Sequence, residues 1–137
     1  MITGLSHVSI AVPSLEAAAA RLKALYGLVV GEPRVNEEQG IRLAYIDLGN
    51  ARIELMEPTR ADSSISKFLE HHPVGGIHHF CLNVDDVVAT ATGVTAKGVR
   101  VLGESGNTRN VHGERIAFVH PKDFYGALVE LEEHQTR

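Results

Sequence analysis

The chain has a single cysteine, no tryptophan and few aromatic residues, which make up 5% of its 137 residues. Because a lone cysteine cannot form an intramolecular disulfide, Cys81 is typical of a protein from a reducing compartment. No stretch approaches the roughly 20 consecutive apolar residues of a membrane helix. The first residues show a strand-like pattern where a signal or transit peptide would stand. We therefore expect a cytoplasmic protein that does not insert into a membrane.

Positive charge is not in excess either. The formal net charge is −4 and the pI is near 6.0, so neither nucleic acid nor an anionic membrane surface is an expected partner. A local basic patch for a small anionic ligand is compatible with this balance. Hydrophobic residues make up 44% of the chain and charged residues 22%, which is typical of a globular protein of one domain.

What the chain does contain is a repeat. Residues 76–85 (GIHHFCLNVD) resemble residues 4–13 (GLSHVSIAVP), since each begins with Gly and a large aliphatic residue and has histidine in fourth place. After each histidine, apolar residues alternate with smaller or polar ones, as in a half-buried strand. His7 and His79 therefore lie on strand faces with small or polar neighbours, and the chain is expected to be a duplicated unit.

The first half has the pattern of a strand, a helix and three more strands. After the strand at residues 7–12, Ser14 is a candidate helix N-cap and Gly27 a candidate helix end. Apolar residues between them recur at helical spacing as far as Leu25. The three further strands are expected at residues 28–30, 41–48 and 52–56. Gly49-Asn50 is a hairpin turn signal between the last two.

The second half repeats this order, and the repeat itself supports its helix. Asp85 or Asp86 is a candidate N-cap, although residues 89–93 (ATATG) are weak helix formers. The sequence thus predicts a single α+β domain of two tandem βαβββ modules. Module 1 spans about 4–58, a linking helix about 62–71, and module 2 about 76–133.

Pairing equivalent positions of the two halves selects four residues, His7, Glu54, His79 and Glu130. The separations are similar, at 47 residues (7 to 54) and 51 residues (79 to 130). Two imidazoles and two carboxylates suit a divalent transition metal such as Co, Mn, Zn or Ni, because the set is too rich in nitrogen for Ca or Mg and lacks the thiolates of a structural zinc site. On an octahedral ion, two positions would stay open for a substrate that chelates through two oxygens.

A single His or Glu on a strand is usually solvated or satisfied locally, so the repetition is what favours a site. The repeat also selects His79 over its neighbour His78, which aligns with Ser6 and faces the other way. Cys81 is interpreted as a small side chain near the site and not as a nucleophile. Histidines without a repeat partner are interpreted as surface or loop residues: His71, His72, His112, His120 and His134.

Together these features resemble the vicinal oxygen chelate superfamily, which includes glyoxalase I, and within it the methylmalonyl-CoA epimerase family. The likeness covers nearly the whole chain, and it is specific as a combination because each motif alone is weak. The matching motifs are residues 7–13 (HVSIAVP), 53–58 (IELMEP), 62–69 (DSSISKFL), 75–79 (GGIHH), 120–123 (HPKD) and 126–132 (GALVELE).

The resemblance implies a curved mixed sheet around a metal site, with His7, Glu54, His79 and Glu130 as ligands. It implies a homodimer with an acyl-CoA substrate and a divalent metal, with cobalt in first place and Mn, Zn or Ni as alternatives. The implied activity is interconversion of (R)- and (S)-methylmalonyl-CoA by metal-assisted proton transfer through an enolate, with Glu130 also acting as a base.

Two departures from the family pattern bear on the mechanism. Some members place a second catalytic glutamate shortly after a Glu-Gln-Gly segment, but here residues 38–40 (EQG) lead to Leu43. Our hypothesis is that Glu54 takes this vacant place, so that Glu54 and Glu130 are the two bases. Residues 108–113 (TRNVHG) also differ from the usual loop, which leaves the details of the acyl-CoA pocket open.

Other functions remain open on the sequence alone. A glyoxalase I-type lactoylglutathione lyase needs the same metal and two bases. A metal-free small-molecule binding module could use the same fold without chemistry. An extradiol dioxygenase is disfavoured, because Glu54 would crowd an iron held by two His and one Glu. The native metal and the choice between methylmalonyl-CoA and ethylmalonyl-CoA are not determined by the sequence.

Overall fold

The computed structural model describes residues 1–102 and 108–134, so residues 103–107 of the predicted second module lie outside the described residues. Its contacts divide the chain into two compact units. The central unit is Val8–His78, and the terminal unit combines Met1–His7 with the chain from His79 onward. The described elements in chain order are β1 (Ile2–Ala11), α1 (Leu15–Tyr26), β2 (Arg34–Asn36), β3 (Ile41–Asp47), β4 (Arg52–Pro58), α2 (Ser66–His71), β5 (Gly76–Val84), α3 (Val87–Ala96), β6 (Val101–Leu102), β7 (Ile116–Val119), the short 3-10 helix η1 (Pro121–Asp123) and β8 (Val129–Glu133).

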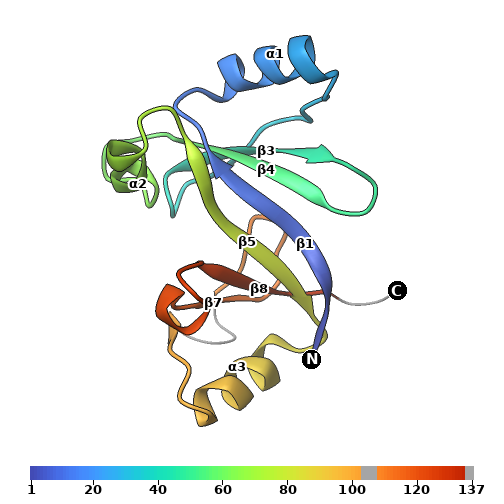
Figure 1. Ribbon diagram of the computed structural model, residues 1–137, viewed down its shortest axis with the longest axis vertical. Helices are drawn as coiled ribbons and strands as arrows, with labels where there is room; N and C mark the ends of the chain where they lie inside the picture. The colour runs from blue at the N-terminus through green and yellow to red at the C-terminus, as the bar shows by residue number, and fades with distance from the viewer. Residues whose placement is uncertain (103–107, 135–137) are drawn as a thin grey trace. The chain divides into compact units, whose positions relative to one another are not determined.

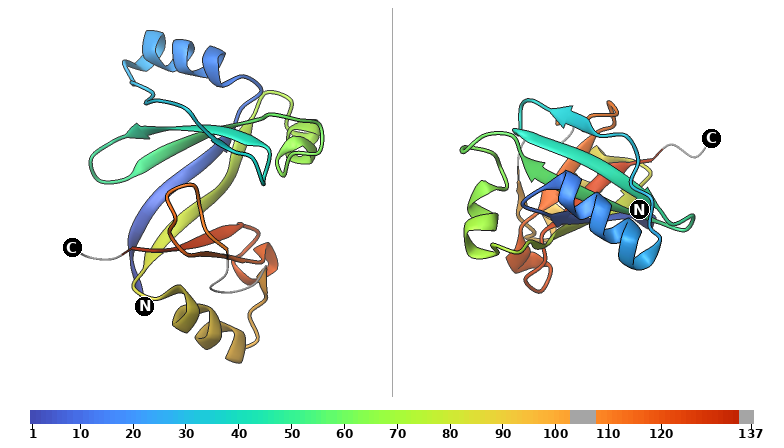
Figure 2. Two further views of the ribbon diagram at one scale, coloured as in Figure 1. Left: turned by 180° about the vertical axis from the view of Figure 1, so that it is seen from behind. Right: turned by 90° about the horizontal axis from the view of Figure 1, so that it is seen from above.

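The sheet of the central unit has the strand order β2-β3-β4-β1. Antiparallel ladders join β2 to β3 and β3 to β4, and the predicted turn at Gly49 closes the second hairpin (Figure 2). Helix α1 packs on β3 and β4 (Figure 1). The buried residues of this core are Leu15, Ala44, Ile46 and Leu55. Ala44 and Ile46 alternate with their neighbours along β3, so the residues next to them face the other side of the sheet.

The ends of α1 follow the predicted signals. The Ser14 hydroxyl accepts a hydrogen bond from the Ala17 backbone N–H at 3.1 Å, and Gly27 ends the helix in the left-handed conformation with φ 69°. Both predictions are confirmed. Leu25 was expected on the buried face but is 58% exposed, because the packed stripe of α1 consists of Leu15, Ala18 and Leu22.

The sheet of the terminal unit has the order β1-β5-β8-β7-β6. Strands β5 and β8 are parallel, whereas β8 pairs antiparallel with β7, and β7 with β6. This mixed pairing confirms the predicted α+β fold with a mixed sheet. Helix α3 packs against β7 and β8 (Figure 1). The buried core on this side consists of Val84, Val87, Ala117, Val119, Val129 and Leu131.

Helix α3 forms despite its weak local propensity. The Asp86 carboxylate caps it by accepting from the Ala89 backbone N–H at 2.8 Å, and Val87 and Ala91 are buried. Tertiary packing therefore outweighs the poor helix formers of this segment. No helix among residues 1–102 and 108–134 is long and apolar enough to cross a bilayer.

One predicted strand is wrong. Residues 28–30 form no strand, and the first strand after α1 is β2, at Arg34–Asn36. Leu28 and Val30 nevertheless pack against the core of the central unit, and the Gly31 backbone N–H binds the Tyr45 carbonyl at 2.9 Å. The apolar alternation in this segment thus reflects packing of an irregular chain and not a hydrogen-bonded ladder.

Candidate metal centre

Three buried side chains from three strands meet in the terminal unit. His7 lies on β1, His79 on β5 and Glu130 on β8. The Oε2 atom of Glu130 is 3.0 Å from Nε2 of His79 and 3.4 Å from Nε2 of His7. The two imidazole rings stand edge to face, with centroids 5.9 Å apart. Three of the four predicted ligands are therefore brought together.

Strand alternation explains how these side chains come to share one face. On β8, Val129 and Leu131 point into the core under α3, so Glu130 and Glu132 face the other way. The parallel register of β5 and β8 places Cys81 opposite Glu130, and His79 lies two residues earlier on the same face of β5. The apolar core thus fixes which polar side chains converge.

The electrostatics of Glu130 favour its charged form. Burial alone would raise the pKa of this carboxyl, but its close contacts with the imidazoles of His7 and His79 outweigh burial and lower the pKa to about 2. Glu130 is therefore a carboxylate at neutral pH, with its oxygens available to a cation.

A second buried carboxylate lies behind His7. Glu132 is 3% exposed and accepts from the Ser6 hydroxyl at 3.3 Å and from the Asn110 amide at 3.1 Å. The Ser6 oxygen is in turn 2.9 Å from Nδ1 of His7. Burial, followed by the nearby charges of Glu114 and Glu130, raises the pKa of Glu132 to about 7.

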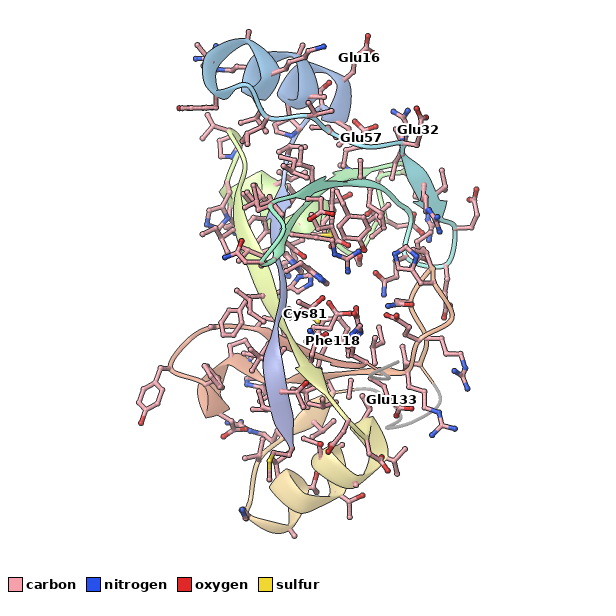
Figure 3. The ribbon with its side chains drawn as sticks, turned by 90° about the vertical axis from the view of Figure 1, so that its right-hand side faces the viewer. Glu16, Glu32, Glu57, Cys81, Phe118 and Glu133 are labelled. Carbon is pink, nitrogen blue, oxygen red and sulfur yellow. The ribbon has the colours of Figure 1, made fainter. Side chains whose placement is uncertain are left out.

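Two less polar side chains, Cys81 and Phe118, lie beside the imidazole and carboxylate groups. Phe118 on β7 meets the His79 ring edge to face at 5.7 Å between centroids. Cys81 is completely buried, and its Sγ is 4.0 Å from Oε2 of Glu132. In the strand register, Cys81 of β5 and Phe118 of β7 lie opposite Glu130 on either side of β8 (Figure 3).

Glu54, the fourth predicted residue, lies on β4 in the central unit. It is buried, and its Oε1 accepts from the Ser9 hydroxyl at 2.8 Å. Its antiparallel partner on β3 is Tyr45, whose ring carries the Arg52 guanidinium at 4.3 Å from the centroid. Within its unit, Glu54 thus has a fixed orientation on the face opposite the apolar core.

The remaining histidines lie elsewhere. His78, the neighbour of His79, packs edge to face on Phe68 in the central unit, with centroids 5.1 Å apart. His71, His72, His112 and His134 are exposed, and His120 is half-buried. Four residues of this group were not predicted from the sequence: Glu132, Ser6, Asn110 and Phe118. Glu132 could have been found, because it follows Glu130 at the spacing of one strand face.

The donor set of His7, His79 and Glu130 fits a divalent metal. Metal–ligand bonds of about 2.0–2.2 Å place neighbouring ligands on one ion about 3 Å apart, and the observed separations from Glu130 Oε2 are 3.0 and 3.4 Å. All three side chains are buried, and two nitrogens with one carboxylate oxygen suit a transition metal. The buried His/Glu cluster is thus consistent with a divalent metal site.

Comparison with known proteins identifies the family of this chain. Residues 6–118 match the family model described as the glyoxalase/bleomycin resistance protein/dioxygenase superfamily. The chain is 46% identical to the ethylmalonyl-CoA/methylmalonyl-CoA epimerase of Cereibacter sphaeroides, over 97% of this chain and 99% of that protein. The chain belongs to the methylmalonyl-CoA epimerase family of this superfamily.

Solved structures of that family match the fold closely. The methylmalonyl-CoA epimerase of Mycobacterium tuberculosis superposes with a TM-score of 0.88 at 36% identity, covering 98% of this chain and 90% of that one. A methylmalonyl-CoA epimerase in complex with methylmalonyl-CoA and an ammonium ion has a TM-score of 0.86 at 40% identity, covering 96% and 94%. Acyl-CoA binding is therefore observed in a close structural relative.

Proposed function

We propose that the protein interconverts the (R) and (S) epimers of methylmalonyl-CoA by metal-assisted proton transfer. The observation that carries the proposal is the convergence of two imidazole nitrogens on one buried carboxylate oxygen. It occurs in a chain 46% identical to an epimerase of ethylmalonyl-CoA and methylmalonyl-CoA. Epimerisation requires removal of the proton between the thioester and carboxylate groups of the substrate and its return on the opposite face.

In this proposal His7, His79 and Glu130 hold the ion, and Glu54 is the fourth ligand. Cobalt is the first choice, and manganese, zinc and nickel satisfy the same donor set. When bound, the ion supplies Lewis-acid catalysis to the two chelating oxygens of the substrate, which acidifies the proton between them. The position of Glu54 is supported by the sequence repeat, in which it is the counterpart of Glu130.

The proton is moved by the two glutamates. Glu130 accepts it from one face of the substrate, and Glu54 returns a proton to the other face, so that the stereochemistry inverts and the reverse reaction exchanges their tasks. This assignment is supported by the leucine at position 43, close to the place where some members of the family that the sequence resembles have a second catalytic glutamate. Each positioned acid–base group contributes about 10²–10⁴-fold in rate.

The test is solvent-deuterium exchange at the α-carbon of methylmalonyl-CoA, followed by mass spectrometry. We expect exchange with cobalt-loaded protein and none after chelation, and ethylmalonyl-CoA is assayed in parallel to rank the substrates. His79→Ala should abolish both metal binding and exchange. His78→Ala is the matched control, since it removes the neighbouring histidine and should keep both. Exchange that is independent of metal, or absent with it, would refute the proposal.

Assembly and location are further parts of the proposal. A homodimer is supported by the family resemblance and by exposed apolar side chains on β1, where Ile2 is 53% and Leu5 44% exposed. Sedimentation analysis of wild type and Leu5→Glu tests it, since the charged side chain should dissociate a dimer formed through this strand. A cytoplasmic location stays a prediction from the single cysteine.

A further inference from the structure

The mechanism above leaves one buried carboxylate unused. Glu132 is the second buried glutamate of β8, and a hydrogen-bonded path leads from it through the Ser6 hydroxyl to His7. A buried carboxylate is unfavourable unless hydrogen bonds satisfy it. The hydrogen bonds to Glu132 come from Asn110 and Ser6, and the orientation of Asn110 determines the direction of the others.

The orientation of the Asn110 amide is set by the backbone. Its Oδ1 accepts from the N–H groups of His112 and Glu114, both at 3.0 Å. The Nδ2 group must therefore face the other way, where it donates to Oε2 of Glu114 and to Oε2 of Glu132, both at 3.1 Å. Both amide hydrogens are used, and Glu132 Oε2 is fixed as an acceptor.

The direction of hydrogen-bond donation at Ser6 determines which nitrogen of His7 carries a hydrogen. Ser6 donates its hydroxyl hydrogen to Oε1 of Glu132 at 3.3 Å, so the Ser6 oxygen is left to accept from Nδ1–H of His7 at 2.9 Å. A neutral imidazole carries one hydrogen, and placing it on Nδ1 leaves the lone pair on Nε2. Nε2 is the atom directed toward Glu130, and only an unprotonated nitrogen can bind a metal.

We propose that Glu132 is a positioning residue that, through Ser6, holds His7 in the tautomer whose Nε2 can bind the metal. The inference rests on the metal site of the proposed function, but not on the reaction catalysed there. Replacing a carboxylate that orients a metal-ligating histidine typically weakens metal binding by about 10–100-fold. Here the carboxylate acts across an intervening hydroxyl.

Glu132→Gln reverses the chain of hydrogen bonds with almost no change in shape. Asn110 still presents an N–H to the Oε2 position, so the glutamine oxygen takes that position and its NH₂ group faces Ser6. Ser6 must then accept from the glutamine and donate to Nδ1 of His7, which moves the imidazole hydrogen to Nε2. The exposed Glu32→Gln removes the same charge and is the matched control.

Two measurements on the full chain test the proposal without any substrate. Zinc titration of the metal-free protein should give an affinity about 10–100-fold weaker for Glu132→Gln and unchanged for Glu32→Gln. Nitrogen NMR of the metal-free protein should show a hydrogen on Nδ1 of His7 in wild type and none on Nδ1 in Glu132→Gln. Because neither readout involves catalysis, failure here is distinguishable from failure of the proposed epimerase activity.

A double-mutant cycle with Ser6→Ala separates positioning from a general structural effect. If Glu132 acts through Ser6, the Glu132→Gln change should have little further effect on zinc affinity in the Ser6→Ala background. Equal losses in both backgrounds, an unchanged affinity, or a His7 hydrogen that stays on Nδ1 in Glu132→Gln would each overturn the proposal.

A rival use of Glu132 is direct ligation. Ligand atoms of His7, Cys81 and Glu132 lie within 4.8 Å of one another, so this trio could itself hold an ion. Cobalt-loaded protein decides between the two, because a cobalt–thiolate bond gives an intense charge-transfer absorption. We expect no such band and a spectrum unchanged in Cys81→Ser, whereas a band that disappears in Cys81→Ser would overturn the positioning assignment.

Discussion

Glu130 and Glu54 are counterparts in the repeat, yet their surroundings differ. Glu130, on β8 of the terminal unit, has two imidazole nitrogens at 3.0 and 3.4 Å from one oxygen. Glu54, on β4 of the central unit, accepts from a neutral hydroxyl, that of Ser9, at 2.8 Å. Equivalent places in the repeat therefore have different hydrogen-bond partners.

The difference teaches what a repeat can and cannot specify. Alternation of apolar and polar residues puts both glutamates on the face of their strand opposite the core. The groups that surround each carboxylate are supplied by other strands and loops, where the two halves have diverged. We therefore expect the two glutamates to differ in the size and the direction of their contributions to catalysis.

The largest effect is expected for Glu130→Gln. The change removes a metal ligand and a base while keeping the volume of the side chain. Epimerisation should fall by at least about 10²–10⁴-fold, the contribution of a positioned acid–base group, and zinc affinity should fall with it. Steady-state assays and metal titration measure the two losses. Retention of full activity would show that the cluster around Glu130 is structural.

A smaller and directional effect is expected for Glu54→Gln. If Glu54 serves one face of the substrate, deuterium exchange should be slowed by about 10²-fold from one epimer and remain faster from the other. Each pure epimer is incubated in D₂O and the label is followed by mass spectrometry. A variant that keeps its metal and loses no activity in either direction would rule out Glu54 as the second base.

The surroundings of Glu130 also predict that wild type and Glu130→Gln differ in stability at acid pH in the metal-free protein. The pKa of Glu130 is lowered from 4.5 to about 2, so its stabilising contribution is fully present above pH 4.5 and is lost as the pH falls toward 2. At one pKa unit per 1.36 kcal/mol, the contribution is on the order of 3 kcal/mol. Urea unfolding should show Glu130→Gln less stable than wild type at pH 6 and nearly equal at pH 2.

Much of this arrangement could be predicted from the sequence, because it depends on short-range patterns. Strand alternation and the repeat selected His79 over His78, and Ser14 and Gly27 marked the ends of α1. Residues 28–30 were mistaken for a strand, since packing alone and a ladder produce the same apolar alternation.

The meeting of the side chains behind His7 was beyond such patterns. Strand spacing could indicate that Glu132 shares a face with Glu130, but nothing in the local sequence indicates that its side chain meets those of Ser6 and Asn110. The positions of buried polar groups depend on the three-dimensional pairing of strands and loops, which a pattern of single residues does not encode.

The smallest effect is expected for Ser9→Ala, which leaves Glu54 in place and removes one hydrogen-bond donor to it. Ser9 is completely buried, and a hydrogen bond to a charged group contributes about 1.5–3 kcal/mol. The free energy of unfolding should therefore fall by about 1.5 kcal/mol or more, with the epimer-specific deuterium exchange shifted by less than in Glu54→Gln.

Ser14→Ala is the matched control, because the same substitution at the cap of α1 lowers stability by about 0.5–2 kcal/mol without touching Glu54. If Ser9 orients Glu54 for proton transfer, only Ser9→Ala should alter the ratio of exchange rates from the two epimers. If both variants leave that ratio unchanged, the Ser9 hydroxyl stabilises the fold and the asymmetry between the two glutamates arises at Glu130 alone.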